Sequence, residues 1–176
     1  MSSLSEFRAN FASGARPTLY QVTLNFPASV ASGDAARKFQ FTCKTASIPG
    51  MQSGTVLVPY MGRKIKLAGD REVQDMQMTV INDTDWIVRT AFERWMQMIN
   101  GQSENVGATR LADYSVDMLL EQLDRAGNPI ATYTLVGAFP VVVDPIGLSY
   151  EAVDQIEEFG VTLAYQWFTR AESGIV

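Results

Sequence analysis

The sequence predicts a mainly β fold, an antiparallel sandwich or barrel with one flanking α-helix, in a single domain over residues 1–176. Many short runs alternate apolar and polar residues with a period of two, which is typical of strands that bury one face. One stretch near the middle instead has apolar residues at helical spacing. The length of 176 residues, of which 47% are hydrophobic, suits one domain with its own core.

The N-terminal half begins with two predicted strands. Apolar residues alternate with polar ones over 20–26, and the same pattern recurs over 38–43. The single cysteine, Cys43, closes the second series, so we expect its thiol to be an inert core group and not a reactive one. Residues 28–37 and 102–113 are small and polar, and are expected to form surface loops.

Residues 47–71 have the composition of a β-hairpin arm that projects from the body. The segment holds four glycines and two prolines, and strands are expected over 55–60 and 64–67 with a turn at Met61 and Gly62. An isolated hairpin is only marginally stable in water. We therefore expect this arm to lie on another chain.

The densest basic patch of the chain lies within this arm, at Arg63, Lys64 and Lys66, with Arg71 nearby. One interpretation is contact with a phosphate or a nucleic acid. The other is salt bridging to a neighbouring copy, on which the candidate partners are Asp113, Asp117, Glu157 and Glu158. The formal net charge of −5 favours the second interpretation, because a nucleic-acid surface is expected to be basic.

A strand is expected over 76–81, and an amphipathic helix follows at about 84–100. The apolar residues of the helix are spaced by four, three and four, at Val88, Phe92, Trp95 and Ile99. Asp83 or Thr84 is expected as the N-cap and Gly101 as the C-cap. We expect the apolar stripe to pack on the sheet; a groove for a partner is the alternative.

Three further strands are expected in the C-terminal half, over 114–123, 130–136 and 159–168. The segment 124–129 has the turn chemistry of a hairpin connection. In the last strand, the inward residues are expected to be Phe159, Val161, Leu163, Tyr165 and Trp167.

The composition argues against an enzyme. The chain has no histidine, which removes the usual general base near neutral pH and the commonest metal ligand. The sequence contains no glycine pattern for binding phosphates or dinucleotides and no carboxylate cluster with metal-ligand spacing. We therefore expect no catalytic residue, no metal site and no cofactor. It also lacks an apolar run of roughly 18 residues and a secretory signal, so no membrane anchor is expected.

Five stretches of the chain, taken in order, carry a family resemblance: GARPTLYQVTLNFP, FQFTCKTASIPG, VPYMGRKIKLAGDR, TVINDTDWIVRTAFERWMQMIN and FPVVVDPIGLSYEAVDQIEEFGVTLAYQWF. Together they resemble the tail tube protein family of contractile-tailed bacteriophages, and VPYMGRKIKLAGDR is the most specific of them. The stretches cover most of the chain. The family is in turn similar to the tube proteins of type VI secretion and of tailocins.

The resemblance implies a structural virion protein. Hexameric rings would stack helically into the rigid inner tail tube, through which the genome is delivered during sheath contraction. The implied partners are further copies of the chain, the tail sheath protein, baseplate or initiator and tail terminator proteins, and the tape-measure protein and genomic DNA in the lumen. The implied location is the tail of the virion, after assembly in the host cytoplasm.

Under this resemblance, three surfaces are expected. Contacts between subunits or rings are expected in the arm, at Ile48, Met51, Val56, Val58, Tyr60, Arg63, Lys64, Lys66, Asp70 and Arg71. An acidic lumen lining, which DNA could slide past, is expected to include Asp117 and Glu121. The polar side of the helix, with Arg89, Glu93 and Arg94, is expected to face the sheath.

Two expectations concern mobile or projecting segments. Residues 1–16 are expected to form an N-terminal arm that is mobile until assembly, because termini order only when they are tied down. Truncation of Tyr60 or deletion of residues 50–62 is expected to block tube polymerisation and to leave the domain folded.

Three alternatives remain at this point. The first is the tube protein of a phage-derived contractile injection system, and the second is a tail terminator or baseplate ring protein. The third is a monomeric β-barrel that carries a small apolar ligand. A carrier needs a hollow core, and the many Phe, Met and Trp side chains are sufficient to fill a single domain.

Overall fold

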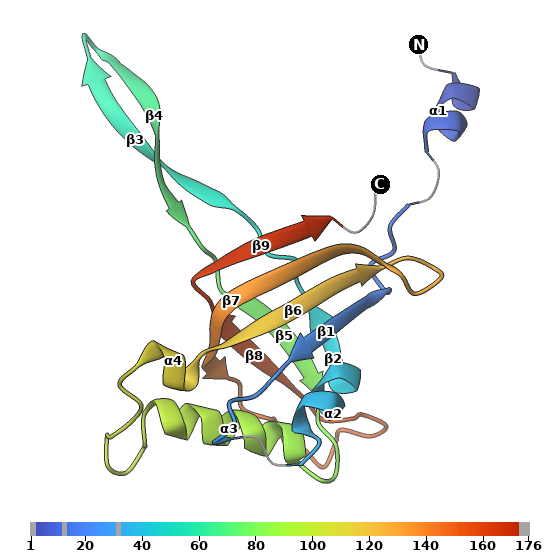
Figure 1. The fold of residues 1–176 in the computed structure, drawn as a ribbon, viewed down its shortest axis with the longest axis vertical. Coiled ribbons are helices and arrows are strands. Elements are labelled where there is room, and N and C mark those ends of the chain that lie inside the picture. Colours follow the sequence, from blue (N-terminus) through green and yellow to red (C-terminus); the bar gives the residue numbers. More distant parts are fainter. Residues whose placement is uncertain (1–2, 12–13, 31–32, 173–176) are drawn as a thin grey trace.

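The computed structural model describes residues 3–11, 14–30 and 33–172, which form nine strands and four helices (Figure 1). The strands are β1 (Tyr20–Leu24), β2 (Cys43–Ala46), β3 (Gln52–Tyr60), β4 (Arg63–Glu72), β5 (Met76–Ile81), β6 (Val116–Leu123), β7 (Pro129–Val143), β8 (Glu158–Ala164) and β9 (Trp167–Glu172). The helices are α1 (Leu4–Asn10), α2 (Ala35–Thr42), α3 (Ile87–Ile99) and α4 (Leu111–Tyr114).

Seven strands form one antiparallel sheet that is folded into two halves. The strand order is β1-β6-β7-β8-β5-β2, and β9 pairs with β7 beside this path. The long β7 is shared, because residues 131–136 pair with β9 while residues 139–143 pair with β8. The two halves enclose one core, to which both contribute alternate residues of their strands. The predicted antiparallel sandwich is therefore confirmed.

The sheet bends where β7 passes from one half to the other. Val136 and Gly137 together lie opposite the single residue Asp117 of β6, which makes a β-bulge. Gly137 has a positive φ of 66°, a conformation that glycine adopts without a steric cost. Its N–H donates to the Asp117 carboxylate at 3.0 Å, so a side chain of β6 holds the bulge.

The predicted strand over 159–168 is wrong in one respect, because the chain changes halves within it. β8 ends at Ala164 and β9 starts at Trp167, and between them the N–H of Gln166 donates to the carbonyl of Val136 at 3.0 Å. The first four expected inward residues are buried, whereas Trp167 is 55% exposed. Alternation alone cannot reveal such a corner, because the period of two continues through it.

The predicted amphipathic helix is confirmed as α3, and its apolar stripe lies in the core. Val88, Phe92 and Trp95 are buried, and Phe92 and Trp95 pack with Phe26 in a cluster of aromatic rings. The expected cap is wrong: the N-cap is Trp86, which has a left-handed backbone.

The N-cap differs from the predicted residues because a carboxylate one residue before Trp86 accepts a backbone N–H of the first turn of α3. The side chain of Asp85 accepts the N–H of Ile87 at 3.2 Å. Asp83 instead accepts the N–H of the adjacent Thr84 at 2.7 Å. Gly101 follows the C-cap Asn100 and donates its N–H to the carbonyl of Val106.

The predicted strand over 38–43 is wrong, because residues 35–42 form helix α2. Phe39 is fully buried while Phe41 is 76% exposed, as expected for residues two apart on a helix. Phe39 packs against Phe92 of α3, and Lys38 forms ion pairs with Asp83 and Asp85 in the segment just before α3. Contacts with α3 thus stabilise a helix in a segment that is too short for its periodicity to distinguish a helix from a strand.

Candidate assembly interface

The arm is a separate two-stranded sheet that projects from the body at one end of the long axis (Figure 1). β3 and β4 are joined by Met61 and Gly62, whose φ values of 45° and 78° are typical of a tight type I′ hairpin turn. The structure therefore contains the hairpin that the composition predicts, with the turn at the expected residues.

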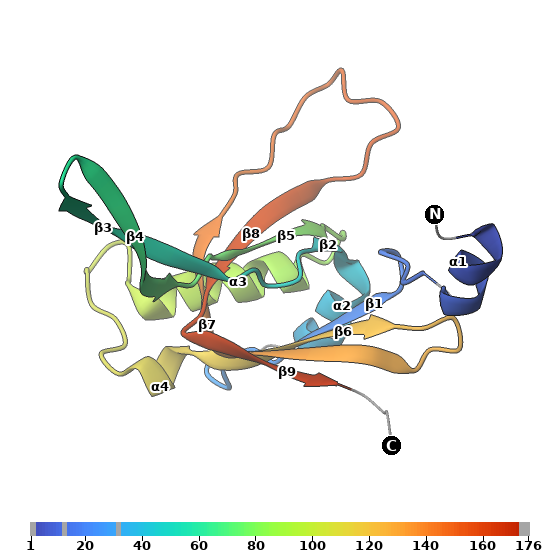
Figure 2. The same cartoon turned by 90° about the horizontal axis from the view of Figure 1, so that it is seen from above.

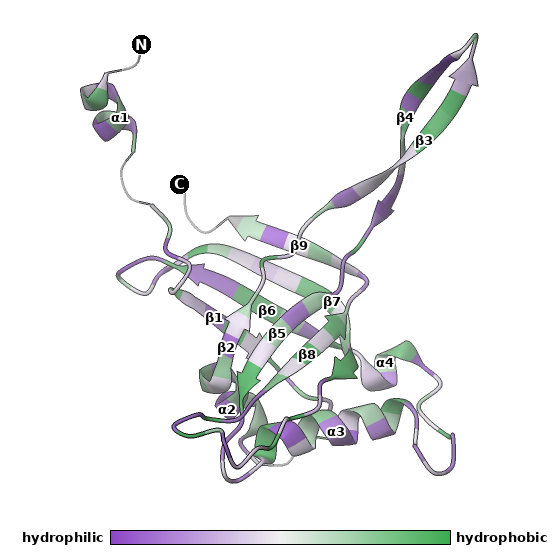
Figure 3. Cartoon of the chain, turned by 180° about the vertical axis from the view of Figure 1, so that it is seen from behind, coloured by the Kyte–Doolittle hydropathy of each residue, from purple (hydrophilic) through white to green (hydrophobic). Residues whose placement is uncertain are grey.

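The register of the hairpin separates two faces. Directly opposed residues share a face, so the pairs Val56–Leu67, Val58–Ile65 and Tyr60–Arg63 define one apolar face that ends in a cation. The other face carries the pairs Leu57–Lys66 and Pro59–Lys64. Apolar residues are visible along β3 in Figure 3. The arm is thus apolar on one side and basic on the other.

Neither face of the hairpin is covered by the described residues of its own chain. The apolar side chains of the arm are between 40% and 86% exposed, among them Val58 at 40% and Tyr60 at 62%. At its base, Ile48 and Met51 are 50% and 68% exposed, and Arg71 reaches the Met51 sulfur at 3.5 Å. Contiguous exposed apolar surface of this kind marks an interaction site.

The outer face of the first half-sheet carries the two residues predicted for a lumen lining. Asp117 and Glu121 alternate on β6 with the buried Met118 and Leu120. Glu121 lies in register with Thr132 of β7, and the other outward positions of these strands are mostly threonine, glutamine and small apolar residues. Residues 131–136 of β7 pair with β6 and β9, and β6 pairs with β1. Among these described, paired residues, no lysine or arginine occupies an outward position.

The three residues predicted to face the sheath differ in their surroundings. Arg89 makes three contacts within its own chain. Its guanidinium donates to Glu93 at 2.7 Å and to the carbonyl of Asp144 at 2.6 Å, and it lies 5.0 Å from the ring centre of Phe159. Glu93 and Arg94 are exposed on the outer side of α3. The contact with the sheath stays a prediction, and Glu93 and Arg94 are the side chains that are accessible for it.

The predicted N-terminal arm contains a short helix that carries apolar residues into solvent. Ser3 and Glu6 form a reciprocal capping box at the start of α1. Leu4, Phe7 and Phe11 are 68%, 59% and 54% exposed, and the two phenylalanine rings stack at 5.2 Å. Residues 1–2 and 12–13 of the predicted arm lie outside the described residues.

Two features of the described residues bear on chemistry, namely possible metal ligands and the thiol. These residues contain no group of three or more His, Cys, Asp or Glu side chains placed to hold a metal ion. Burial raises the pKa of the Cys43 thiol to about 12, so it stays protonated at neutral pH. The expectation that Cys43 is a buried core residue is confirmed, and its lack of reactivity stays a prediction. Among the helices of the described part, none is long and apolar enough to cross a membrane.

Comparisons with known proteins point to one family. The family described as phage tail tube protein matches residues 15–171. The chain is 33% identical over 168 residues to the tail tube protein of Serratia phage KSP90, covering 94% of this chain and 95% of that protein. It is 29% identical over 155 residues to tail tube protein gp19 of Enterobacteria phage T4, covering 88% and 90% of the two chains.

Solved structures share the fold at low sequence identity. A chain of the anti-feeding prophage baseplate matches with a TM-score of 0.67 and 15% identity, over 93% of this chain and 99% of the other. A chain of the PVC sheath-tube complex, from an extracellular contractile injection system, matches with a TM-score of 0.57 and 12% identity, over 98% and 99%. The family match over most of the chain and the KSP90 relative together decide the assignment: the chain belongs to the phage tail tube protein family.

Proposed function

We propose that copies of this chain form hexameric rings, and that the rings stack into the rigid inner tube of a phage tail, through which the genome is delivered. As a phage tail tube protein, the chain is a structural protein of the virion tail and not an enzyme. The observation that carries the proposal is the hairpin β3–β4, whose two faces lie in solvent although an isolated hairpin is only marginally stable.

Ring closure is supported by the edges of the folded sheet. Among the described residues, β1, β9 and β2 each pair on one side only, which leaves unpaired backbone groups that a neighbouring copy can bind. A head-to-tail contact between different surfaces of identical copies closes into a ring when the rotation fits. The neighbour would therefore extend the sheet around a channel.

The lumen and the outer wall follow from the two faces of such a ring. The outer face of the first half-sheet, with Asp117 and Glu121, would line the channel and repel phosphate, so that DNA passes without sticking. Glu93 and Arg94 of α3 would meet the sheath protein on the outside. Baseplate or initiator, terminator and tape-measure proteins are the remaining proposed partners, and assembly would take place in the host cytoplasm.

Negative-stain electron microscopy of the purified chain at increasing concentration tests this function, with purified baseplate added as a nucleus. Hollow tubes, or rings with an open centre, are the expected result. Deletion of residues 50–62 should abolish the tubes while the far-ultraviolet circular dichroism of the body is retained. Compact monomers of the wild-type chain under all of these conditions would overturn the proposal.

A further inference from the structure

The loop between β7 and β8 is the most acidic part of the chain. Residues 144–158 contain five acidic residues and no basic one. The same loop exposes large apolar side chains, and those of Leu148, Tyr150, Val153 and Ile156 are at least 72% exposed. It extends from the body as a long excursion beyond β8 (Figure 2). An exposed apolar surface set among charges is typical of a protein–protein contact.

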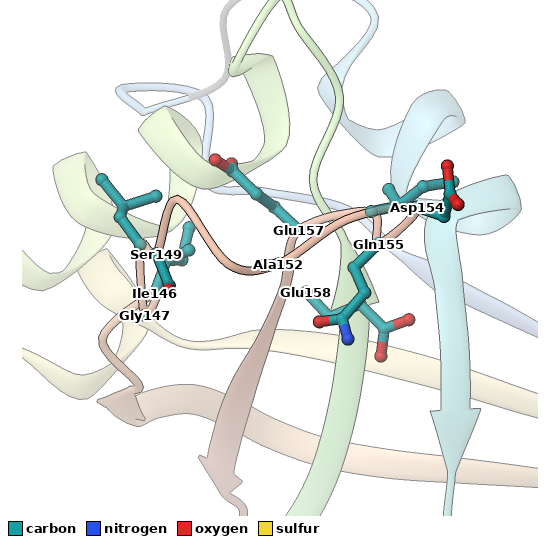
Figure 4. Close-up of a pocket in the computed structure, with 10 residues that line it drawn as sticks. Ile146, Gly147, Ser149, Ala152, Asp154, Gln155, Glu157 and Glu158 are labelled. Carbon is teal, nitrogen blue, oxygen red and sulfur yellow. The ribbon is translucent and has the colours of Figure 1, made fainter.

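The loop borders an open hollow of about 740 Å³ (Figure 4). The lining residues are Ile146, Gly147, Leu148, Ser149, Ala152, Asp154, Gln155, Ile156, Glu157 and Glu158. Its walls therefore combine apolar groups with carboxylates.

Both ends of the loop are anchored to the body. At the start, the carbonyl of Asp144 accepts from Arg89 of α3, and its N–H donates to the carbonyl of Gly160. At the end, Asn82 binds both the backbone and the side chain of Glu157. The loop is thus presented from fixed points, which lowers the entropy lost when a partner binds.

Three of the five carboxylates, those of Asp144, Glu151 and Asp154, have no partner within the described residues. Glu158 pairs with Lys44 at 2.5 Å, and Glu157 accepts from Asn82 at 2.9 Å. The carboxylates of Glu151 and Asp154 make no ion pair and no hydrogen bond to any described residue. These two are free to pair with cations from outside.

The hairpin is the complementary surface. Residues 47–71 hold four basic residues and one acidic residue in a chain whose net charge is −5. Arg63, Lys64 and Lys66 make no ion pair with a described residue. The hairpin therefore offers the exposed cations that the loop lacks, and these cations lie beside an uncovered apolar face.

The two surfaces lie at opposite ends of the molecule. The hairpin leaves the body at one end of the long axis, whereas the β7–β8 loop lies at the other end, beside α2 and α3 (Figures 1 and 3). A hairpin cannot reach the loop of its own chain in this arrangement. Complementary surfaces at opposite ends favour head-to-tail contacts, which grow into a filament when they do not close.

We infer that the hairpin tip of one copy docks onto the 144–158 loop of another copy. The apolar face at Val58 and Tyr60 packs on the apolar loop side chains, and Arg63 at the end of that face pairs with one of the carboxylates of Glu151 and Asp154. Lys64, on the opposite face beside the turn, pairs with the other carboxylate around the hairpin tip. The inference rests on the proposed stacking function and names the surface that receives the arm. A second copy is the occupant because this one chain supplies both halves of the charge and apolar match.

Charge reversal on either side tests this contact. The hairpin variant Arg63→Glu with Lys64→Glu, and the loop variant Glu151→Lys with Asp154→Lys, should each raise the protein concentration needed for tube growth by at least about tenfold. A chain that carries all four changes restores opposite charges across the contact and should recover tube growth.

The controls separate the contact from the proposed function. The same gain of positive charge as in the loop variant, placed outside both surfaces at the exposed positions Glu104→Lys and Asp34→Lys, should leave tube growth unchanged. Tubes from both reversed variants, or a fourfold variant no better than either, would overturn the docking and leave the tube function standing. A wild-type chain that forms neither rings nor tubes would overturn the tube function itself.

A cross-link gives an independent readout. Met61→Cys at the hairpin tip and Ser149→Cys in the loop should form a disulfide between copies, seen as a ladder on a non-reducing gel after mild oxidation. The buried Cys43 does not compete. The same tip cysteine combined with Ser103→Cys, in the 102–113 loop, should give no ladder. Equal ladders from the two pairs, or none from the first, would overturn the inference.

Discussion

At the scale of single residues, Cys43 shows how burial controls reactivity. It lies at the junction of α2 and β2, is 8% exposed, and its thiol donates to the carbonyl of Thr45 at 3.5 Å. Removal from water disfavours the thiolate and raises the pKa to about 12. The folded chain therefore binds the thiol proton more tightly than the unfolded chain does.

This difference predicts a loss of stability at alkaline pH. Below the ordinary thiol pKa of 9.0 both states are protonated, whereas above it the unfolded chain loses the proton first. The free energy of unfolding of the wild type should therefore fall relative to Cys43→Ala by up to about 1.4 kcal/mol per pH unit between pH 9 and 12. Urea unfolding of both chains at pH 8, 9 and 10 measures this. Parallel curves over that range would contradict the prediction.

At the scale of elements, the hairpin owes its two chemical faces to its register. Residues opposed across β3 and β4 share a face, so a shift of one residue would mix the apolar and the basic sets. The turn at Met61 and Gly62 holds this register. The arm is therefore pre-formed for a partner, although its own chain leaves it uncovered.

The apolar face of the hairpin should control assembly without affecting the fold. Val58→Asp places a charge where we expect an apolar contact, and should raise the critical concentration for tube growth more than about tenfold, since burial of a valine contributes at least about 1.5 kcal/mol. Val106→Asp makes the same change at a loop position that is 70% exposed, and should assemble like the wild type. Sedimentation across a concentration series measures both, and equal behaviour of the two variants would argue against the apolar contact.

At the scale of the whole molecule, the folded sheet separates a threonine-rich, acidic face from the face that carries the core and helices. Glu121 lies in register with Gln21 on one side and Thr132 on the other. Asp117 on the same face has a second role, because it accepts the N–H of Gly137 at the bulge. A change at Asp117 would therefore alter the bend of the sheet as well as the charge of the face.

Lysines on this face should make assembled tubes retain DNA. Glu121→Lys with Thr134→Lys leaves Asp117 intact and adds cations that bind phosphate in a salt-dependent manner. After incubation with short DNA and nuclease treatment, tubes of this variant should hold protected DNA that wild-type tubes lack. Glu104→Lys with Thr109→Lys, in the 102–113 loop, is the control with the same charge change. Equal DNA retention by wild-type and lysine tubes would show that the face does not line the channel.

Several features of the molecule could be predicted from local sequence. The alternation over 20–26 and 76–81, the stripe of α3 and the turn at Met61 and Gly62 each follow from residues within a few positions of one another. The exposed arm followed from its composition, because its residues are too few to bury both faces. The family resemblance rested on the same short stretches, and the comparisons confirm it.

Only the tertiary structure decided the features that depend on distant residues. Residues 35–42 are helical because Phe39 packs against Phe92 of α3, a contact that alternation over six residues does not reveal. The sheet bends because Gly137 meets Asp117 of another strand. The basic hairpin and the acidic 144–158 loop lie at opposite ends because of the path of the whole chain. Local patterns determine most of the elements and the apolar face of each, whereas the helix at 35–42, the bend of the sheet and the placement of the elements depend on which of those faces meet.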